Sequence, residues 1–211
     1  LVAKTDLGGV VTSIELGNLG NKEGEISYIG ELILEDFDIG TFAKDPRFNR
    51  VSLKADIEGE GFQIGTLGTS FSGDIYSLDF LNYTYENIYA VGDFYANQFE
   101  GRIEVSDENL NVDFSGLADL SSELNNFDFK ASVDFANLHA LGFVKRDSAS
   151  VFKGDLDIDI VGNSFDNIIG VSRFDNITYQ SAKQEYYFET LQISSSNKNG
   201  VKSFRVESKD V

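Results

Sequence analysis

The chain contains no cysteine, methionine or tryptophan, and among its 211 residues there is one proline and one histidine. The absence of cysteine excludes disulfides, thiolate metal sites and a cysteine nucleophile. The sequence also lacks an apolar run of about 18 residues, the length that a membrane-spanning helix requires. It has no initiator methionine and no signal peptide, so we expect a fragment of a larger or processed chain.

Positive charge is scarce as well. The chain carries 17 basic and 35 acidic residues, which gives a formal net charge of −18. Such an excess of negative charge argues against nucleic acid, and against an anionic lipid surface, as a direct partner. Apolar residues make up 41% of the chain, which favours a folded domain over disorder.

The dominant pattern is alternation of apolar and polar residues. In residues 154–160, Leu156, Ile158 and Ile160 share one face, and aspartates occupy the other. Similar alternation occurs in residues 53–58, 110–115 and 127–135. A period of two is typical of half-buried strands with one apolar and one solvated face. The whole chain predicts about 13 to 15 short strands and an all-β fold.

Turn-forming residues between these runs predict turns and little helix. The sequence Asn-Lys-Asn-Gly at residues 197–200 predicts a hairpin between residues 191–194 and 201–206. Residues 41–49, 137–143 and 164–169 interrupt the alternation, and each is expected to cap or plug an apolar face. We expect one to three short helical turns, with residues 137–143 and 164–169 as candidates for one turn each. We expect a single continuous architecture over residues 1–211, with a weak seam at the polar loop of residues 145–150.

The apolar faces must be covered, because each buried aliphatic or phenylalanine side chain contributes roughly 1.5–3 kcal/mol. Two sheets could pack face to face, or one sheet could close around a filled core. Alternatively, an elongated, curled antiparallel sheet could keep an apolar trough inside, occupied partly by its own side chains and partly by a ligand. About 13 strands at about 4.8 Å spacing would make such a trough roughly 60 Å long.

Several stretches resemble one family. They are Phe37–Gly40 with residues 51–61; residues 73–92 with 99–103 and 113–119; and residues 153–176 with 186–194. In this order they resemble the TamB-type translocation and assembly module proteins of the AsmA-like, repeating β-groove group, particularly the Bacteroidetes-type members. The match covers roughly residues 30–195 and would make this chain an internal or C-terminal-region fragment. It contains no single sharp motif.

The resemblance implies a β-taco, a curled sheet that is apolar inside and polar outside. It implies a non-enzymatic role in phospholipid transport between the inner and outer membranes, and in outer-membrane protein assembly and secretion. The implied partners are a phospholipid, or another acyl-chain ligand, and an outer-membrane Omp85-type barrel. The implied location is the periplasm of a Gram-negative bacterium, with an inner-membrane anchor that lies outside this sequence.

The candidate ligand-facing residues are the apolar members of the alternating runs. They could line a groove, or some of them could be ordinary core. They are Phe37, Ile39, Val112, Phe114, Phe127, Phe129, Val133, Phe135, Leu156, Ile158 and Ile160.

Other motifs predict no chemistry. The spacing of Asp155, Asp157 and Asp159 superficially resembles a calcium loop, but Ile160 stands where the sharp turn needs glycine. His139 has no nucleophile nearby in sequence. We therefore expect no enzyme activity, no metal and no cofactor. The alternative function is a β-sandwich binding or adhesion module for carbohydrate or protein, with Tyr83, Tyr85 and Tyr89 expected on one shared face.

Overall fold

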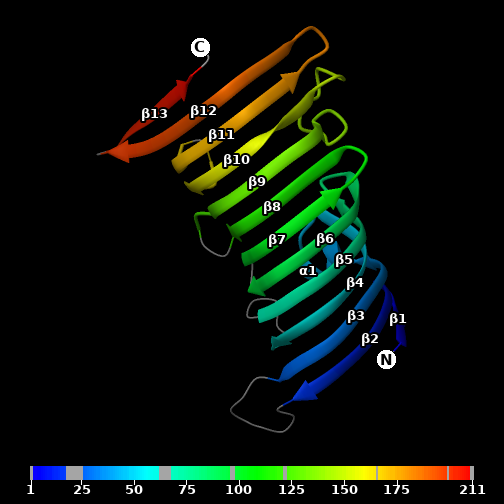
Figure 1. Ribbon diagram of the computed structural model, residues 1–211. Coiled ribbons are helices and arrows are strands. Elements are labelled where there is room, and N and C mark those ends of the chain that lie inside the picture. Colours follow the sequence, from blue (N-terminus) through cyan, green and yellow to red (C-terminus); the bar gives the residue numbers. More distant parts are fainter. Residues whose placement is uncertain are drawn as a thin grey trace. The chain divides into compact units, whose positions relative to one another are not determined.

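A computed structural model describes residues 2–17, 26–61, 68–95, 98–120, 123–164, 166–198 and 200–209. The chain divides into two compact units, an N-terminal unit (Leu1–Asp107) and a C-terminal unit (Glu108–Val211). The division does not fall at the loop of residues 145–150, which lies within the C-terminal unit. The all-β prediction is confirmed, since strands dominate both units (Figure 1).

In the N-terminal unit the strands pair antiparallel with their neighbours in chain order. A short helix, α1 (Ile39–Ala43), joins the third strand to the fourth. The strands are β1 (Val2–Thr5), β2 (Gly8–Gly17), β3 (Ser27–Asp38), β4 (Phe48–Glu60), β5 (Gly68–Phe80), β6 (Tyr83–Tyr95) and β7 (Gln98–Ser106).

The C-terminal unit is built in the same way, as an antiparallel meander without a helix among its described residues. The predicted hairpin is confirmed, because Lys198 aligns with Val201 at the start of the final strand pair. The strands are β8 (Leu110–Asp119), β9 (Asn126–Asn137), β10 (Val151–Val161), β11 (Ile169–Gln180), β12 (Glu185–Lys198) and β13 (Val201–Ser208).

Each unit is a single layer of strands. Among the described residues, the substantial contacts within a unit join strands that are neighbours in the sheet, apart from the contact of α1 with β4. The sheets are open: β1 pairs with β2 alone, and β13 with β12 alone, in the part of the chain that the structure describes. The described residues of each unit therefore do not form the two packed sheets of a β-sandwich.

Bulges interrupt the alternation of side chains in strands of both units. In β3 the register shifts between Leu34 and Phe37, where Asp36 has a φ of 48°. In the C-terminal unit the register shifts opposite Asp134 of β9 and near Asn176 of β11, whose φ is 53°. Bulges bend a strand and increase its local twist, so they re-aim the side chains beyond them.

The contiguous core of the N-terminal unit lies beside α1. Leu34, Phe37, Val51, Leu53 and Ala55 are each at most 8% exposed, and Ile39 at the start of α1 packs against them. Asp38 caps this helix by accepting a 2.8 Å hydrogen bond from the Thr41 backbone N–H. The helix begins before the expected turn of residues 41–49, because this cap is at Asp38.

The other expected turns are only partly helical. Leu141 N–H donates to the Asn137 carbonyl at 3.0 Å, which closes one helical turn in the expected segment 137–143. In segment 164–169, Ile168 N–H donates to the Ser164 carbonyl at 3.0 Å, whereas Phe165 lies outside the described residues. Among the described residues, no helix is both long and apolar enough to cross a membrane.

Candidate functional site: the apolar sheet face

Strand register brings most of the candidate ligand-facing residues together on one face of the C-terminal unit, which we call the apolar face. Ile158 of β10 lies opposite Phe129 of β9, and Ile160 lies opposite Phe127. One row further along, Leu156 lies opposite Ala131, which in turn lies opposite Phe114 of β8. Because side chains alternate along each strand, all of these residues point to the same side.

The row continues into the later strands. Ile158 aligns with Ser172 of β11, Ser172 with Ile193 of β12, and Ile193 with Val206 of β13. The neighbouring row runs from Leu156 through Phe174 to Leu191. The apolar surface therefore extends across the unit at right angles to the strands.

Small residues make room for the rings. Gly116 lies opposite Phe129, and its φ of 140° belongs to a conformation that side-chain-bearing residues rarely adopt. A Cβ at this position would lie 2.5 Å from the Phe129 Cα. The space left by Gly116 admits the rings of Phe114 and Phe129, whose centroids are 4.9 Å apart.

Burial on this face is incomplete. Ile158 is 5% exposed, but Phe114, Phe127, Phe129, Val112, Val133, Leu156 and Ile160 are all only half-buried. Further out, Phe204 is 41% exposed and Val206 is 63% exposed. A single layer of strands covers its side chains only with their lateral neighbours, so this surface can still bury apolar area against a ligand.

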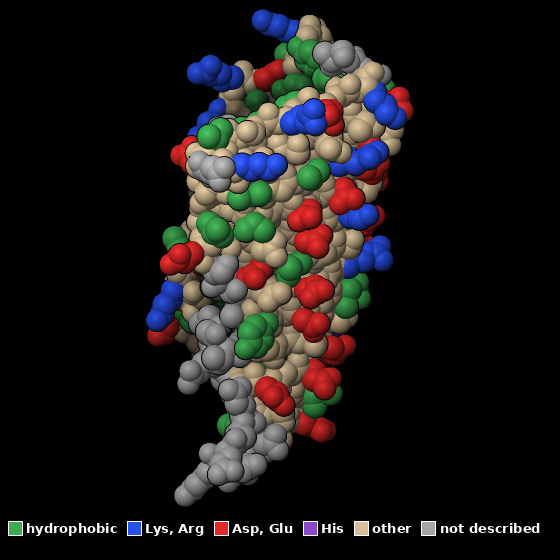
Figure 2. Space-filling model, turned by 90° about the vertical axis from the view of Figure 1, so that its left-hand side faces the viewer, with side chains coloured by type: hydrophobic (Ala, Val, Ile, Leu, Met, Phe, Trp, Pro, Cys, Tyr) green, Lys and Arg blue, Asp and Glu red, His purple; other side chains and the backbone are tan. Residues whose placement is uncertain are grey.

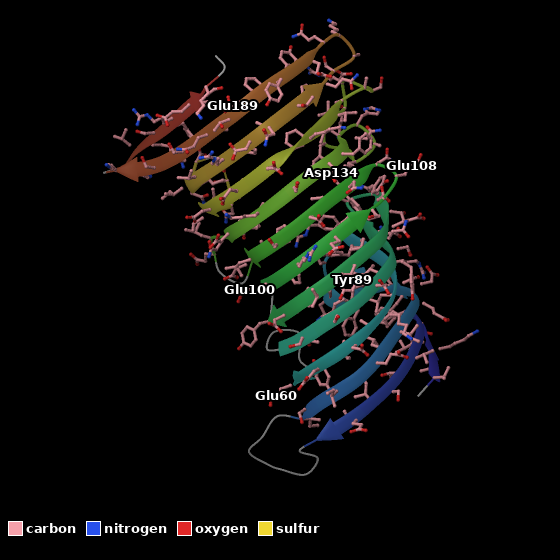
Figure 3. All side chains as sticks on the ribbon, in the orientation of Figure 1. Glu60, Tyr89, Glu100, Glu108, Asp134 and Glu189 are labelled. Carbon is pink, nitrogen blue, oxygen red and sulfur yellow. The ribbon has the colours of Figure 1, made fainter. Side chains whose placement is uncertain are left out.

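Two candidate residues, Phe135 and Ile39, do not lie where the alternation predicted, and Phe37, like Ile158, is already covered. The bulge at Asp134 (Figure 3) aligns Phe135 with Asn111, and by register Ala136 takes its expected place opposite Leu110. Ile39 lies in α1 and not in a strand, because β3 ends at the Asp38 cap. Phe37 keeps its place on the apolar face of the N-terminal unit, where it is 7% exposed and belongs to the core.

The apolar face of the N-terminal unit carries the core residues that the sequence analysis did not select. Leu53 and Ala55 belong to an alternating run that predicted a strand, yet only Phe37 and Ile39 were chosen from this part of the chain. The alternation of residues 53–58 could have identified Leu53 and Ala55 as residues of the apolar face. The face also includes Phe71, Phe94 and Phe99, with ring centroids 5.9 Å apart in the first pair and 4.8 Å apart in the second.

The opposite face, which we call the charged face, carries ion pairs and carboxylates. Figure 2 shows acidic and basic side chains on one side of the molecule, with hydrophobic side chains among them. Lys130 Nζ lies 3.2 Å from Asp157, and Arg173 Nε lies 2.8 Å from Asp175. The hydrogen bonds from Arg173 lower the pKa of Asp175 below its ordinary value. These contacts lie on a solvated surface and each contributes little to stability.

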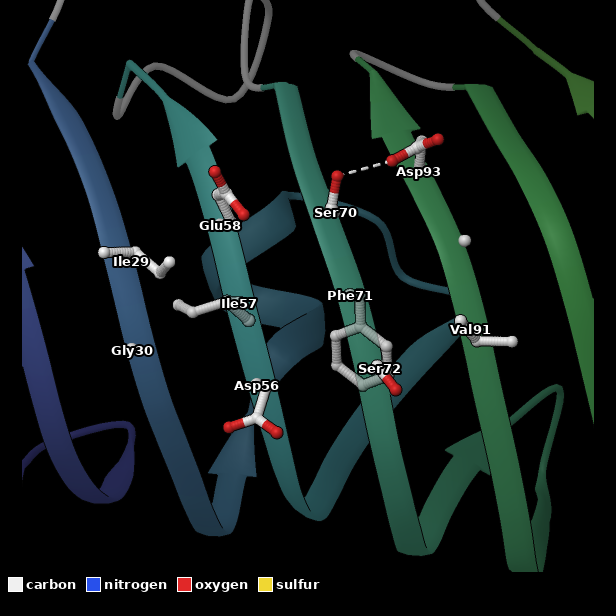
Figure 4. A pocket seen from close by; sticks show the side chains of 11 residues that line it. Ile29, Gly30, Asp56, Ile57, Glu58, Ser70, Phe71, Ser72, Val91 and Asp93 are labelled. Atoms are coloured by element: carbon white, nitrogen blue, oxygen red, sulfur yellow. Dashed lines mark hydrogen bonds between the residues drawn. The ribbon is translucent and has the colours of Figure 1, made fainter.

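Cavities also open on the charged face. One in the N-terminal unit has a volume of about 500 Å³ (Figure 4). It forms because β5 presents the small Ser70 and Ser72 between larger neighbours, which include Asp56, Glu58, Ile29, Val91 and Asp93. Ser70 Oγ donates to Asp93 at 2.6 Å, so these two lining side chains are already hydrogen-bonded to each other.

No catalytic or metal-binding constellation emerges from the residues described. The aspartates of β10 are spread along the charged face, where Asp155 accepts a 2.7 Å hydrogen bond from Ser132. Within the described part of the chain, no group of three or more acidic, histidine or cysteine side chains could hold a metal ion. His139 Nδ1 lies 2.9 Å from the Val144 carbonyl, a contact that organises its own loop.

The three tyrosines of the alternative hypothesis do not share a face. Tyr85 aligns with Leu78 on the apolar face of the N-terminal unit, and burial raises its pKa. Tyr89 aligns with Asp74 and Glu104 on the charged face (Figure 3). Asn87 lies between them with a φ of 53° and changes the phase of the alternation. Tyr83 and Tyr85 share the apolar face, with ring centroids 4.7 Å apart, so the prediction of one face for all three tyrosines is wrong at Tyr89.

The chain was compared with family models, curated proteins and solved structures, and none of them matches it. The geometry of the apolar face is accordingly the basis for the functional argument.

Proposed function

We propose that this chain is a non-enzymatic β-groove segment that shields lipid acyl chains against its apolar face. In this proposal it belongs to a TamB-type protein of the Gram-negative periplasm. The whole protein supports phospholipid transport between the two membranes and outer-membrane protein assembly, with an Omp85-type barrel as its partner. In this proposal, the sheet of each unit curls into a trough with an apolar interior.

One observation carries the proposal: a wide apolar face is left half-buried on a single-layered sheet. Phe127, Phe129 and Ile160 form adjacent positions across β9 and β10, and no second layer of strands within the unit packs on them among the described residues. Acyl chains match this surface, because they bury apolar area without needing hydrogen-bond partners.

The charge distribution supports the same ligand. On β10 the apolar face holds Leu156, Ile158 and Ile160, whereas the charged face holds aspartates. An acidic outer surface keeps a segment soluble and repels lateral aggregation. A lipid tail would therefore bind to one face only, and a benzophenone probe can distinguish the two faces.

The test is photocrosslinking in the chain expressed in a Gram-negative periplasm, with p-benzoylphenylalanine at the half-buried Ile160 or Phe129. The matched control carries the probe at Asp159, which neighbours Ile160 but lies on the charged face. We expect phospholipid adducts by mass spectrometry at residues 160 and 129 and none at 159. Lipid-free protein in native mass spectrometry, together with no adduct at either apolar position, would overturn the proposal.

A further inference from the structure

The loop between β9 and β10, residues 138–150, is held in place by its own hydrogen bonds. Leu138 N–H donates to the Ser150 carbonyl at 2.9 Å, and Val144 N–H donates to the Leu138 carbonyl at 2.9 Å. Leu141 is 5% exposed and Ser150 is fully buried. Ordered loops of this length are usually functional, and a fixed loop fixes which side chains it presents to its surroundings.

One large apolar side chain of this loop faces solvent. Gly142 N–H donates to the His139 carbonyl at 3.0 Å, and its φ of 81° is the left-handed conformation that commonly ends a helical turn. Phe143 follows directly and is 67% exposed, the largest exposed fraction of any described phenylalanine. The buried Leu141 therefore anchors the loop, whereas the ring of Phe143 lies largely outside its packing.

Two exposed cations follow this phenylalanine in the same loop. Neither Lys145 nor Arg146 forms an ion pair with a carboxylate among the described residues. The adjacent carboxylate, Asp147, accepts a 3.0 Å hydrogen bond from the Ala149 N–H and a 3.1 Å hydrogen bond from the Ala182 N–H. Because backbone groups engage this carboxylate, both cations remain available for an anion outside the chain.

The same carboxylate brings a third cation to this end of the unit. Ala182 belongs to the loop of residues 181–184, between β11 and β12, at the same end of the strands as the β9–β10 loop (Figure 1). Lys183 is next in the chain, is exposed, and has no ion pair in the part of the chain that the structure describes. The two loops together contain three basic residues and one acidic residue, whereas the whole chain has a net charge of −18. We name the following residues the basic loop patch: Phe143, Lys145, Arg146 and Lys183.

We propose that the basic loop patch binds the surface of a bilayer that contains anionic phospholipid. The ring of Phe143 inserts at the boundary between headgroups and acyl chains, and the three cations lie against the lipid phosphates. An apolar side chain beside several cations is the combination by which peripheral proteins bind such surfaces. This contact is separate from acyl-chain binding by the apolar face and does not depend on it.

The size and the charge of the patch favour a bilayer over an acidic protein. A specific protein interface buries about 1,000 Å² or more, which is a large area for two loops, whereas a fluid bilayer accepts a small anchor. The net charge of the chain opposes approach to an anionic surface, but salt screens charges that are more than about 8 Å away at physiological ionic strength. The charge of the two loops therefore decides the contact, which is weak and sensitive to salt.

Tryptophan fluorescence tests the insertion of residue 143, because the chain has no tryptophan of its own. We expect the emission of Phe143→Trp to move to shorter wavelength with vesicles of equimolar phosphatidylcholine and phosphatidylglycerol, and not with phosphatidylcholine alone. The matched control is Tyr95→Trp in the N-terminal unit, at a side chain that is 59% exposed. Its emission should not move. Equal shifts of both variants, or no shift for Phe143→Trp, would overturn the proposed insertion.

Vesicle flotation tests the cations. Lys145→Glu combined with Arg146→Glu should lower partitioning onto the mixed vesicles about tenfold or more. The matched control, Lys4→Glu combined with Lys153→Glu, changes the net charge equally at two exposed strand residues, so we expect a much smaller loss. Circular dichroism checks that each variant keeps its fold. The proposal would be refuted by equal losses in both variants, by unchanged partitioning of the loop variant, or by a wild-type chain that does not float at low ionic strength.

Discussion

In the N-terminal unit, α1 lies against the apolar side of β4, and Leu53 at the centre of the cluster is 8% exposed. In the C-terminal unit, Phe129 occupies a comparable mid-strand position on the apolar face, yet it remains half-buried. Both units have the same antiparallel meander and the same alternation. The difference teaches that alternation produces an apolar face, whereas packing at each position decides which of its residues become core. Ile158, directly opposite Phe129, is 5% exposed in a unit without a helix among its described residues.

Truncating one apolar side chain in each unit tests this difference in burial most directly. Leu53→Ala should lower the free energy of unfolding by about 3 kcal/mol, because it opens a cavity in a covered cluster. Phe129→Ala removes more atoms but from a half-exposed site, so we expect a loss of about 1–2 kcal/mol. Urea titration of both variants measures the difference. A larger loss at Phe129 would show that its face is covered in solution.

Lipid should act on the two units differently. A short-chain phosphatidylcholine below its micelle concentration should slow amide exchange in β9 and β10 more than in β3 and β4. At a hundredfold excess over Kd, the added stability is about 2.7 kcal/mol. Hydrogen–deuterium exchange with and without lipid measures the change in amide exchange rate for each strand. Protection confined to β3 and β4 would contradict the assignment of the binding surface.

Alanine substitutions at two glycines test how closely the rings of the apolar face are packed. Gly116→Ala should cost about 2 kcal/mol, since its Cβ would meet the Phe129 backbone 2.5 Å away and its φ of 140° is unfavourable for alanine. Gly142→Ala has a φ of 81° but no atom within 4 Å, so we expect only about 1 kcal/mol from backbone strain. Thermal unfolding of the two variants gives the ranking, and a reversed order would argue against close packing at Gly116.

The smallest effect concerns the cap of α1. Hydrogen bonds from the Thr41 backbone and hydroxyl lower the pKa of Asp38 below its ordinary value of 3.8. A lowered carboxyl pKa in the folded state stabilises the fold above the ordinary value, and this stability is lost as pH falls through the folded-state pKa. Asp38→Asn should therefore flatten the acid limb of a stability–pH profile below about pH 4. An unchanged limb would show that the cap does not contribute.

The alternating strands were predictable because each side of a strand is specified by local residue order. The faces of Leu156, Ile158 and Ile160 match the sequence pattern, and so do those of Phe127 and Phe129. Predictions failed where a bulge adds a residue, as at Phe135, and where a left-handed residue separates Tyr85 from Tyr89. A bulge depends on pairing with the neighbouring strand, so the alternation of one strand does not reveal it.

The sequence by itself determined an all-β, acidic chain whose strands have one apolar and one charged face, because hydrophobic periodicity is a property of consecutive residues. Only the tertiary structure decided which of these apolar residues meet across strands and which of them are buried. Those outcomes depend on strand register and on contacts between residues far apart in the chain. The position of a bulge, and the lack of a second layer of strands among the described residues of a unit, leave no pattern in a short stretch of sequence.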